Sequence, residues 1–161
     1  MPVISATKDV DTLTMTFVAE FEATVERVWQ IWADPRKLER WWGPPAWPAT
    51  FERFEFEPGG QARYYMTGPD GTKAHGWWTI TAIEAPHRLE FDDGFADENA
   101  EPIDPKDAMH DTVTIEAAGD RTRMTTVTSF SSVEQLERMV EIGVEEGMRE
   151  AQNQIDELLA A

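Results

Sequence analysis

The sequence predicts an α+β domain in which a curved antiparallel sheet of six to seven strands wraps around a long C-terminal helix. Three observations predict this fold. Strand patterns separated by turn residues fill the middle of the chain, two short helix patterns follow the first strand, and one long helix pattern closes the chain. Because no second core or internal repeat interrupts this order, we expect a single domain over residues 12–161.

The chain begins with a polar segment, residues 1–11, for which we expect a flexible N-terminal arm. From Leu13 to Phe21, apolar and polar side chains alternate with few exceptions. This alternation predicts a strand with one buried face.

Two short helices are predicted after this strand. At Thr24, the spacing of apolar residues changes to that of a helix, and Thr24 can serve as its N-cap. Asp34 and Pro35 begin the second helix as N-cap and first residue. An aromatic loop over residues 41–47 follows, where this topology places the mouth of a cavity.

Six further strand patterns follow, and most end in glycine, proline or aspartate residues that favour turns. They cover residues 50–57, 61–67, 73–84, 88–92, 109–117 and 121–130. Their regular spacing is typical of an antiparallel meander. We interpret the acidic segment 93–108 as a long solvated connection that could serve as a lid or a partner contact.

The closing helix is predicted over residues 132–160, with Ser131 as its cap and Glu134 completing a capping box. Its apolar stripe consists of Leu136, Val140, Gly143, Gly147, Ala151, Ile155 and Leu158. A glycine inside a helix costs about 1 kcal/mol relative to alanine. The pair Gly143 and Gly147 therefore either leaves space for a ligand or lets a bulky neighbour approach the helix.

Composition excludes several classes of function. The chain has 161 residues, no cysteine and a formal net charge of −17, so disulfides, thiolate metal sites and cysteine nucleophiles are absent. A surface this negative repels phosphate backbones and anionic lipids, and we expect neither a nucleic acid nor a membrane as partner. The sequence shows no leader pattern and no long apolar run, which indicates a cytoplasmic protein.

The sequence contains no recognised motif for a nucleophile elbow, a phosphate loop or a dinucleotide site. The three histidines lack metal-binding spacing, and the acidic segment lacks the spacing of a calcium loop. We therefore expect no metal and no cofactor, and the catalytic residues remain unknown. His75 and His110 are the only plausible acid–base imidazoles.

Several segments resemble the START-like helix-grip superfamily (SRPBCC), in particular the branch that resembles the C-terminal domain of the activator of heat-shock-protein-ninety ATPase. The resemblance rests on Asp34-Pro35…Leu38…Trp41-Trp42-Gly43-Pro44, Pro58-Gly59-Gly60, Pro86-His87-Arg88-Leu89 and Glu146-Gly147-Met148, and it spans about residues 12–160. It implies a helix-grip fold whose cavity often holds an apolar small molecule. The separate domain by which the eukaryotic co-chaperone stimulates its chaperone has no room here, so chaperone activation should not be transferred by name.

Strand alternation suggests which residues would line such a cavity. It places Tyr64 and Met66 inward, whereas of the adjacent Trp77 and Trp78 only one can face inward, and parity does not decide which. The candidate cavity residues are Trp42, Phe56, Tyr64, Met66, Trp78, Phe91, Val113, Met124, Thr126, Met139, Gly143, Gly147 and Met148. Plain core packing is the alternative for most of them.

The leading functional hypothesis is binding of an apolar or amphipathic small molecule without covalent chemistry. One alternative is an enzyme of the polyketide cyclase, dehydratase or hydrolase kind, based on family precedent together with His75, His110, Tyr64 and the inward threonines Thr126 and Thr128. A second is a chaperone-associated interaction protein, because the net charge of −17 would favour a basic partner and the aromatic loop over residues 41–47 is expected to be exposed. An outward Trp77 or Trp78 could also form a homodimer patch.

Overall fold

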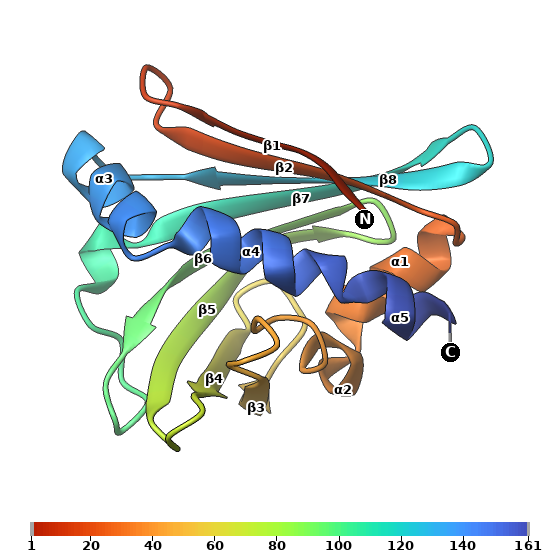
Figure 1. Ribbon diagram of the computed structural model, residues 1–161. Coiled ribbons are helices and arrows are strands. Elements are labelled where there is room, and N and C mark those ends of the chain that lie inside the picture. Colours follow the sequence, from red (N-terminus) through yellow and green to blue (C-terminus); the bar gives the residue numbers. More distant parts are fainter. Residues whose placement is uncertain (1, 161) are drawn as a thin grey trace.

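In residues 2–160, which the computed structural model describes, eight strands form one antiparallel sheet in the order β1-β2-β8-β7-β6-β5-β4-β3. Figure 1 shows this sheet curving beneath the C-terminal helices, which cross its inner face. The strands are β1 (Val3–Asp9), β2 (Thr14–Phe21), β3 (Ala49–Phe54), β4 (Gln61–Thr67), β5 (Lys73–Glu84), β6 (Arg88–Ala96), β7 (Met109–Ala118) and β8 (Arg121–Ser129). The predicted α+β class with a curved antiparallel sheet is confirmed.

Residues 3–9 are not the flexible arm that the sequence predicted. They form the edge strand β1, which pairs with β2 from Val3 opposite Ala19 to Asp9 opposite Thr14. The Val3 N–H also donates to Asn153 Oδ1 at 3.2 Å. Because strand pairing uses main-chain groups, a segment with polar side chains can still complete a ladder. The sheet therefore has eight strands instead of six to seven, and the short helices follow the second strand.

The two short helices lie where the sequence predicted them. The helices are α1 (Val25–Ala33), α2 (Pro35–Leu38), α3 (Val133–Glu141), α4 (Val144–Asn153) and α5 (Ile155–Ala160), with a 3-10 turn, η1, at Pro105–Asp107. Both predicted caps form, because the Thr24 hydroxyl accepts from the Arg27 N–H at 3.2 Å and Asp34 accepts from the Arg36 N–H at 2.9 Å. No helix within residues 2–160 is long and apolar enough to span a bilayer.

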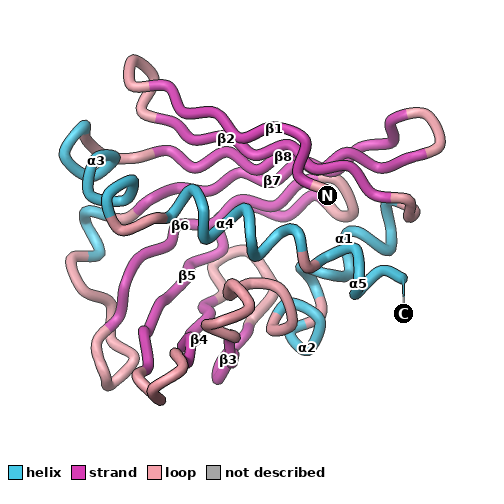
Figure 2. The backbone as a smooth tube through the Cα atoms, in the orientation of Figure 1, coloured by secondary structure: helices cyan, strands magenta, loops and turns pink. Residues whose placement is uncertain are grey.

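The C-terminal helix is not continuous, contrary to the prediction. It breaks at Gly143, whose φ of +87° lies in the left-handed region, and α4 begins at the next residue. Figure 2 shows the resulting helical segments with short connections between them. The cap of α3 is Ser132, which accepts from the Gln135 N–H at 3.1 Å, and not Ser131. Gly143 is therefore explained by backbone conformation, which glycine adopts at little cost.

The core lies between the inner face of the sheet and the helices, and aromatic rings fill its centre. Trp78 on β5 stacks on Phe91 of β6 with 4.1 Å between ring centroids, and Trp42 meets Trp78 edge-on at 4.9 Å. Trp32 of α1 meets Trp41 edge-on at 4.7 Å. Trp41 and Trp42 are both buried, so the aromatic loop after α2 is part of the core.

Trp78 faces inward and Trp77 faces outward, which settles the question that parity left open. Trp77 is nevertheless only 4% exposed. Part of the segment 93–108 extends β6, and a later part reaches back to the outer face, where the Ala100 carbonyl accepts from Arg63 Nε at 3.0 Å. Trp77 therefore offers no exposed patch of the kind from which a homodimer was expected.

The two glycines of the apolar stripe should respond in opposite directions to alanine. Gly143→Ala would place a side chain in the left-handed region, and should lower the free energy of unfolding by about 1 kcal/mol. Gly147 lies inside α4, and no heavy atom outside its own helix lies within 4 Å of an added Cβ. Gly147→Ala should therefore raise the free energy of unfolding by about 0.5–1 kcal/mol. Chemical denaturation measures both changes, and changes of the same sign would contradict this account.

Candidate functional site

Most of the cavity residues proposed from the sequence meet on the inner side of the molecule. Trp42, Trp78, Phe91, Val113 and Met124 are buried in the main core, and Phe56, Tyr64, Met66 and Met148 pack against it half-buried. Met139 lies in a second apolar cluster with Phe17 and Leu136, which Met148 also contacts. Thr126 is buried on β8. Gly143 stands apart from the group, because it occupies the exposed break between α3 and α4.

Tyr64 crosses strand β5 on the inner face. It pairs with Gly76 on that strand, and a Cβ at residue 76 would lie 2.4 Å from the Tyr64 hydroxyl oxygen. Any other residue at position 76 would therefore clash with the Tyr64 ring. The ring stacks on Phe51 at 5.0 Å and meets Trp42 edge-on at 6.1 Å. The hydroxyl is thereby held where the charge of Asp93 on β6 acts on it.

Two indole N–H groups next to Tyr64 make no hydrogen bond of normal geometry, although the Tyr64 hydroxyl lies close to both. The Nε1 atoms of Trp42 and Trp78 are buried and have no hydrogen-bond partner among residues 2–160. Both lie near the Tyr64 hydroxyl, where their N–H groups favour its ionised form. Trp41 is different, because its Nε1 donates to the Ile31 carbonyl at 3.0 Å. A buried polar group without a partner costs about 1–3 kcal/mol, so a well-placed acceptor beside the two indoles would be stabilising.

Two carboxyl groups share the inner face with these rings. Asp93 on β6 pairs with Trp78, and Asp111 on β7 pairs with Thr128 on β8. The two aspartates are 8% and 3% exposed. The Thr128 hydroxyl donates to Asp111 Oδ1 at 2.6 Å, whereas Asp111 Oδ2 has no donor in the described part of the chain. Because the two carboxyl groups lie within hydrogen-bonding reach, one shared proton can supply that donor.

Burial changes the ionisation of these groups. Desolvation, reinforced by the charge and the hydrogen bond of Asp111, raises the pKa of Asp93 well above its ordinary value. Desolvation also raises the pKa of Asp111, although hydrogen bonds from Asp93 and Thr128 act in the opposite direction. Burial, and next the charge of Asp93, raises the pKa of Tyr64. The carboxyl pair therefore keeps a proton that an exposed aspartate would lose.

Sequence reasoning missed both carboxyl groups, although strand parity carries a signal for them. Asp93 continues the inward row that includes Phe91, and Asp111 precedes the inward Val113 by two residues. Asp93 was assigned to the solvated segment because the predicted strand ended at residue 92. Asp111 lies inside a predicted strand, but no motif in the sequence distinguishes it among the 31 acidic residues.

Helix α4 leaves space around Gly147 above the inner face. Gly147 and the adjacent Met148 are both half-buried, and no heavy atom outside the helix lies within 4 Å of an added Cβ at Gly147. Further along α4, Gln152 is fully buried, and its Oε1 has no donor among residues 2–160. Its Nε2 lies 3.5 Å from Thr126 Oγ1. Gly147 and Gln152 both belong to α4, the helix against which the sequence placed a cavity.

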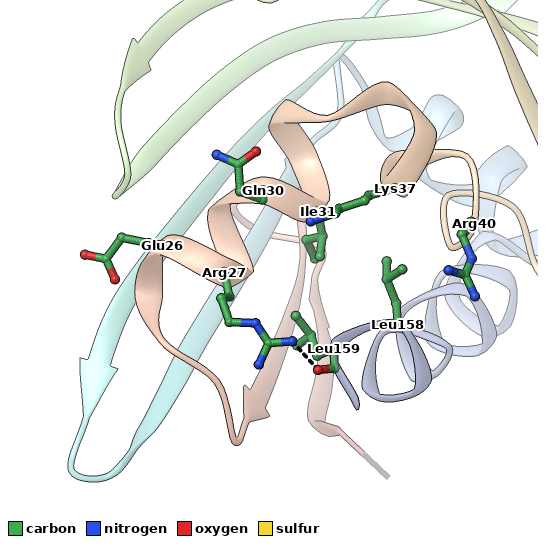
Figure 3. Close-up of a pocket in the computed structure, with 8 residues that line it drawn as sticks. All are labelled: Glu26, Arg27, Gln30, Ile31, Lys37, Arg40, Leu158 and Leu159. Carbon is green, nitrogen blue, oxygen red and sulfur yellow. Dashed lines mark hydrogen bonds between the residues drawn. The ribbon is translucent and has the colours of Figure 1, made fainter. Parts of the chain in front are cut away.

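Two hollows on the surface lie away from these groups. One of about 360 Å³ lies between α1, α2 and α5 (Figure 3), and is lined by Glu26, Arg27, Gln30, Ile31, Lys37, Arg40, Leu158 and Leu159. In it Arg27 Nη2 donates to the Leu159 carbonyl, which fastens α5 to α1. The other, of about 730 Å³, lies beside His75 and Phe95 on the outer side of the sheet. Both hollows are rimmed by charged side chains.

The two histidines that the sequence offered as acid–base groups point to the outer face. The His110 Nδ1 lies 2.7 Å from Asp92 Oδ1, and its Nε2 lies 3.0 Å from Glu90 Oε1. Burial would lower the pKa of His110, but the hydrogen bonds to Asp92 and Glu90 outweigh it and raise the pKa. Neither imidazole reaches the inner carboxyl pair. Within residues 2–160, no three histidine or carboxylate side chains gather in a way that could hold a metal ion.

The chain matches the family model described as "Activator of Hsp90 ATPase homolog 1-like protein" over residues 22–160. It belongs to this family. The expected resemblance is confirmed, and with it the START-like helix-grip fold. None of the curated proteins compared with the chain matches it.

Solved structures of similar chains share this fold over nearly their whole length. A protein from Arthrobacter aurescens is 61% identical with a TM-score of 0.93, and the match covers 98% of this chain and 92% of that one. A protein from Mycobacterium smegmatis is 47% identical with a TM-score of 0.91, covering 99% and 98%. A protein from Staphylococcus epidermidis, 24% identical with a TM-score of 0.84 and covering 98% and 94%, shows the fold alone.

The buried carboxyl pair should make stability depend on pH in a way that Asp93→Asn removes. The raised pKa of Asp93 means that the folded chain keeps a proton that the unfolded chain loses above about pH 3.9. The stabilisation is therefore complete below that pH and is lost as the pH rises through the folded pKa. The free energy of unfolding of Asp93→Asn, relative to that of the native chain, should increase from pH 4 to pH 8. Urea denaturation across this range measures it, and a constant difference would contradict the buried proton.

Proposed function

We propose that this protein binds a small, largely apolar molecule between α4 and the inner face of the sheet, with the polar end of the ligand at Tyr64, Trp42 and Trp78. The single observation that carries the proposal is the pair of buried indole N–H groups that make no hydrogen bond of normal geometry among residues 2–160. A ligand oxygen would accept from them and remove the cost of leaving them unpaired. The ligand-binding function that the sequence suggested thus gains a specific polar end.

The surroundings of the indoles suit an apolar ligand body. Rings of Phe51, Trp78 and Phe91 line this part of the inner face, and adaptable side chains stand beside it at Met66 and Met148. Largely apolar walls with a few convergent polar groups are typical of small-molecule sites. The half-buried state of Tyr64 and Gly147 suggests the side from which a ligand would enter.

A second candidate function is acid–base catalysis at the same place, and the pair Asp93 and Asp111 favours it. A carboxyl group that stays protonated beside the Tyr64 hydroxyl could donate a proton to a carbonyl oxygen of a bound molecule. This chemistry would fit the cyclase, dehydratase or hydrolase activities in the superfamily. Conversion of a bound compound, followed by NMR of the mixture, separates this candidate from binding alone.

The binding proposal predicts a selective effect of Trp42→Phe. This variant keeps a ring in the core but removes one unpaired donor, so it should weaken ligand binding about fivefold, as expected for the loss of one hydrogen bond. Trp47→Phe is the matched control. Trp47 lies in the loop after α2, but its ring packs against Gly68, which follows β4. Affinities are measured by intrinsic tryptophan fluorescence against a panel of aromatic ketones, amides and lipids.

Native mass spectrometry of the freshly purified protein complements this titration, because it reveals any ligand that stays bound from the expression host. The proposal fails if no compound in the panel changes the fluorescence or the melting temperature and only the unliganded mass is seen. It also fails if Trp42→Phe and Trp47→Phe bind the same compounds with equal affinity.

A further inference from the structure

On the inner face, an indole donor without a well-formed hydrogen bond and a buried carboxyl group occupy paired positions on neighbouring strands. The donor is the indole N–H of Trp78, which lies near the Tyr64 hydroxyl but makes no hydrogen bond of normal geometry among residues 2–160. The acceptor is a carboxyl oxygen of Asp93, the residue on β6 that pairs with Trp78 on β5. A proton shared with Asp111 uses one oxygen of each carboxyl group, and the Thr128 hydroxyl uses another oxygen of Asp111. The second oxygen of Asp93 then stays free to accept.

We propose, on the basis of the binding function above, that the ligand carries an uncharged carbonyl group with an adjacent N–H, as in a carboxamide or a lactam. Its carbonyl oxygen accepts from Trp78 and Trp42, and its N–H donates to Asp93. The two requirements come from neighbouring strands, whose axes lie about 4.8 Å apart. The oxygen and nitrogen of one amide group are close enough together to meet both.

The charges around the cluster favour an uncharged group. On the described strands, arginine side chains stand on the outer face, as Arg88 and Arg123 do in ion pairs with Glu90 and Glu20. The inner carboxyl pair, which holds one negative charge when it shares one proton, disfavours a carboxylate ligand. An ammonium group would face the two indole N–H groups, whose hydrogens carry partial positive charge. An amide avoids both conflicts.

A matched series of naphthalene derivatives tests this inference on the native protein. The probes are 2-naphthamide, 2-acetonaphthone, 2-methylnaphthalene, 2-naphthoate and 2-naphthylmethylamine, which share one apolar body and differ only in the polar group. Affinities are measured at pH 7 by isothermal titration calorimetry. We expect the ketone to bind more tightly than the hydrocarbon, because its oxygen accepts from the indole N–H groups. The amide should bind about fivefold more tightly than the ketone, because its N–H adds one hydrogen bond to Asp93. The carboxylate and the ammonium should bind more weakly than the ketone.

Two substitutions at one position provide the matched control. Asp93→Asn keeps an N–H that can donate to Asp111 and an oxygen that can accept, so the preference for the amide over the ketone should persist. Asp93→Leu has a similar shape without polar atoms, so the amide and the ketone should bind this variant equally. ¹⁵N NMR spectra of both variants show whether each one folds, and the probe series on the native protein decides the inference if the leucine variant does not.

The outcomes separate this inference from the function on which it rests. If the hydrocarbon or the ketone binds as tightly as the amide, a ligand site exists but the inferred recognition is wrong. If the ammonium or the carboxylate compound binds most tightly, the inferred amide recognition is likewise wrong. If no member of the series binds, and NMR shows only ordered water at the indoles, both the binding function and this inference fail.

Discussion

The contact between Trp78 and Phe91 keeps water out of the centre of the inner face. It joins β5 to β6 with 4.1 Å between ring centroids, and Trp42 covers it from the loop after α2. Aromatic side chains bury about 150–250 Å² each, so this cluster removes a large area from solvent. Every polar group beside it, Asp93 above all, is thereby placed where charge is costly. The shared proton, the raised pKa of Tyr64 and the unpaired indoles all follow from that exclusion of water.

Stability alone does not explain this arrangement. Phenylalanine at position 42 or 78 would fill much of the same space without an unpaired N–H, and an apolar residue at position 93 would need no proton. Natural chains depart from such local rules mainly at functional sites. Gly76 strengthens this argument, because it leaves β5 bare at the one place where the Tyr64 ring passes over it. A glycine inside a strand has no side chain to pack. At position 76, the missing side chain lets the Tyr64 hydroxyl lie near the indoles of Trp42 and Trp78.

The sequence predicts the fold class and most of its elements, but not the polar site. Alternation on β2, the caps Thr24 and Asp34, and the turn residues between strands are local signals, and the structure confirms the elements that they predicted. Strand β1 could not be predicted, because its backbone is ordered by pairing with β2. The helix break at Gly143 depends on a backbone angle that the regular apolar stripe conceals. The carboxyl pair depends on register between β5, β6 and β7, which no spacing within one strand reveals.

Strand β6 shows how closely two chemical environments can lie on one sheet. Asp92 and Asp93 are adjacent, and the pleat sends them to opposite faces. Asp92 faces outward and lies 2.7 Å from His110 Nδ1, and this hydrogen bond helps to raise the pKa of the histidine. Asp93 faces inward beside the carboxyl group of Asp111, and burial there favours the protonated form of Asp93. The same strand thus contributes to the acidic exterior and supplies an uncharged acceptor inside. The net charge of the chain therefore says little about the ligand, whose polar group would meet only the inner face.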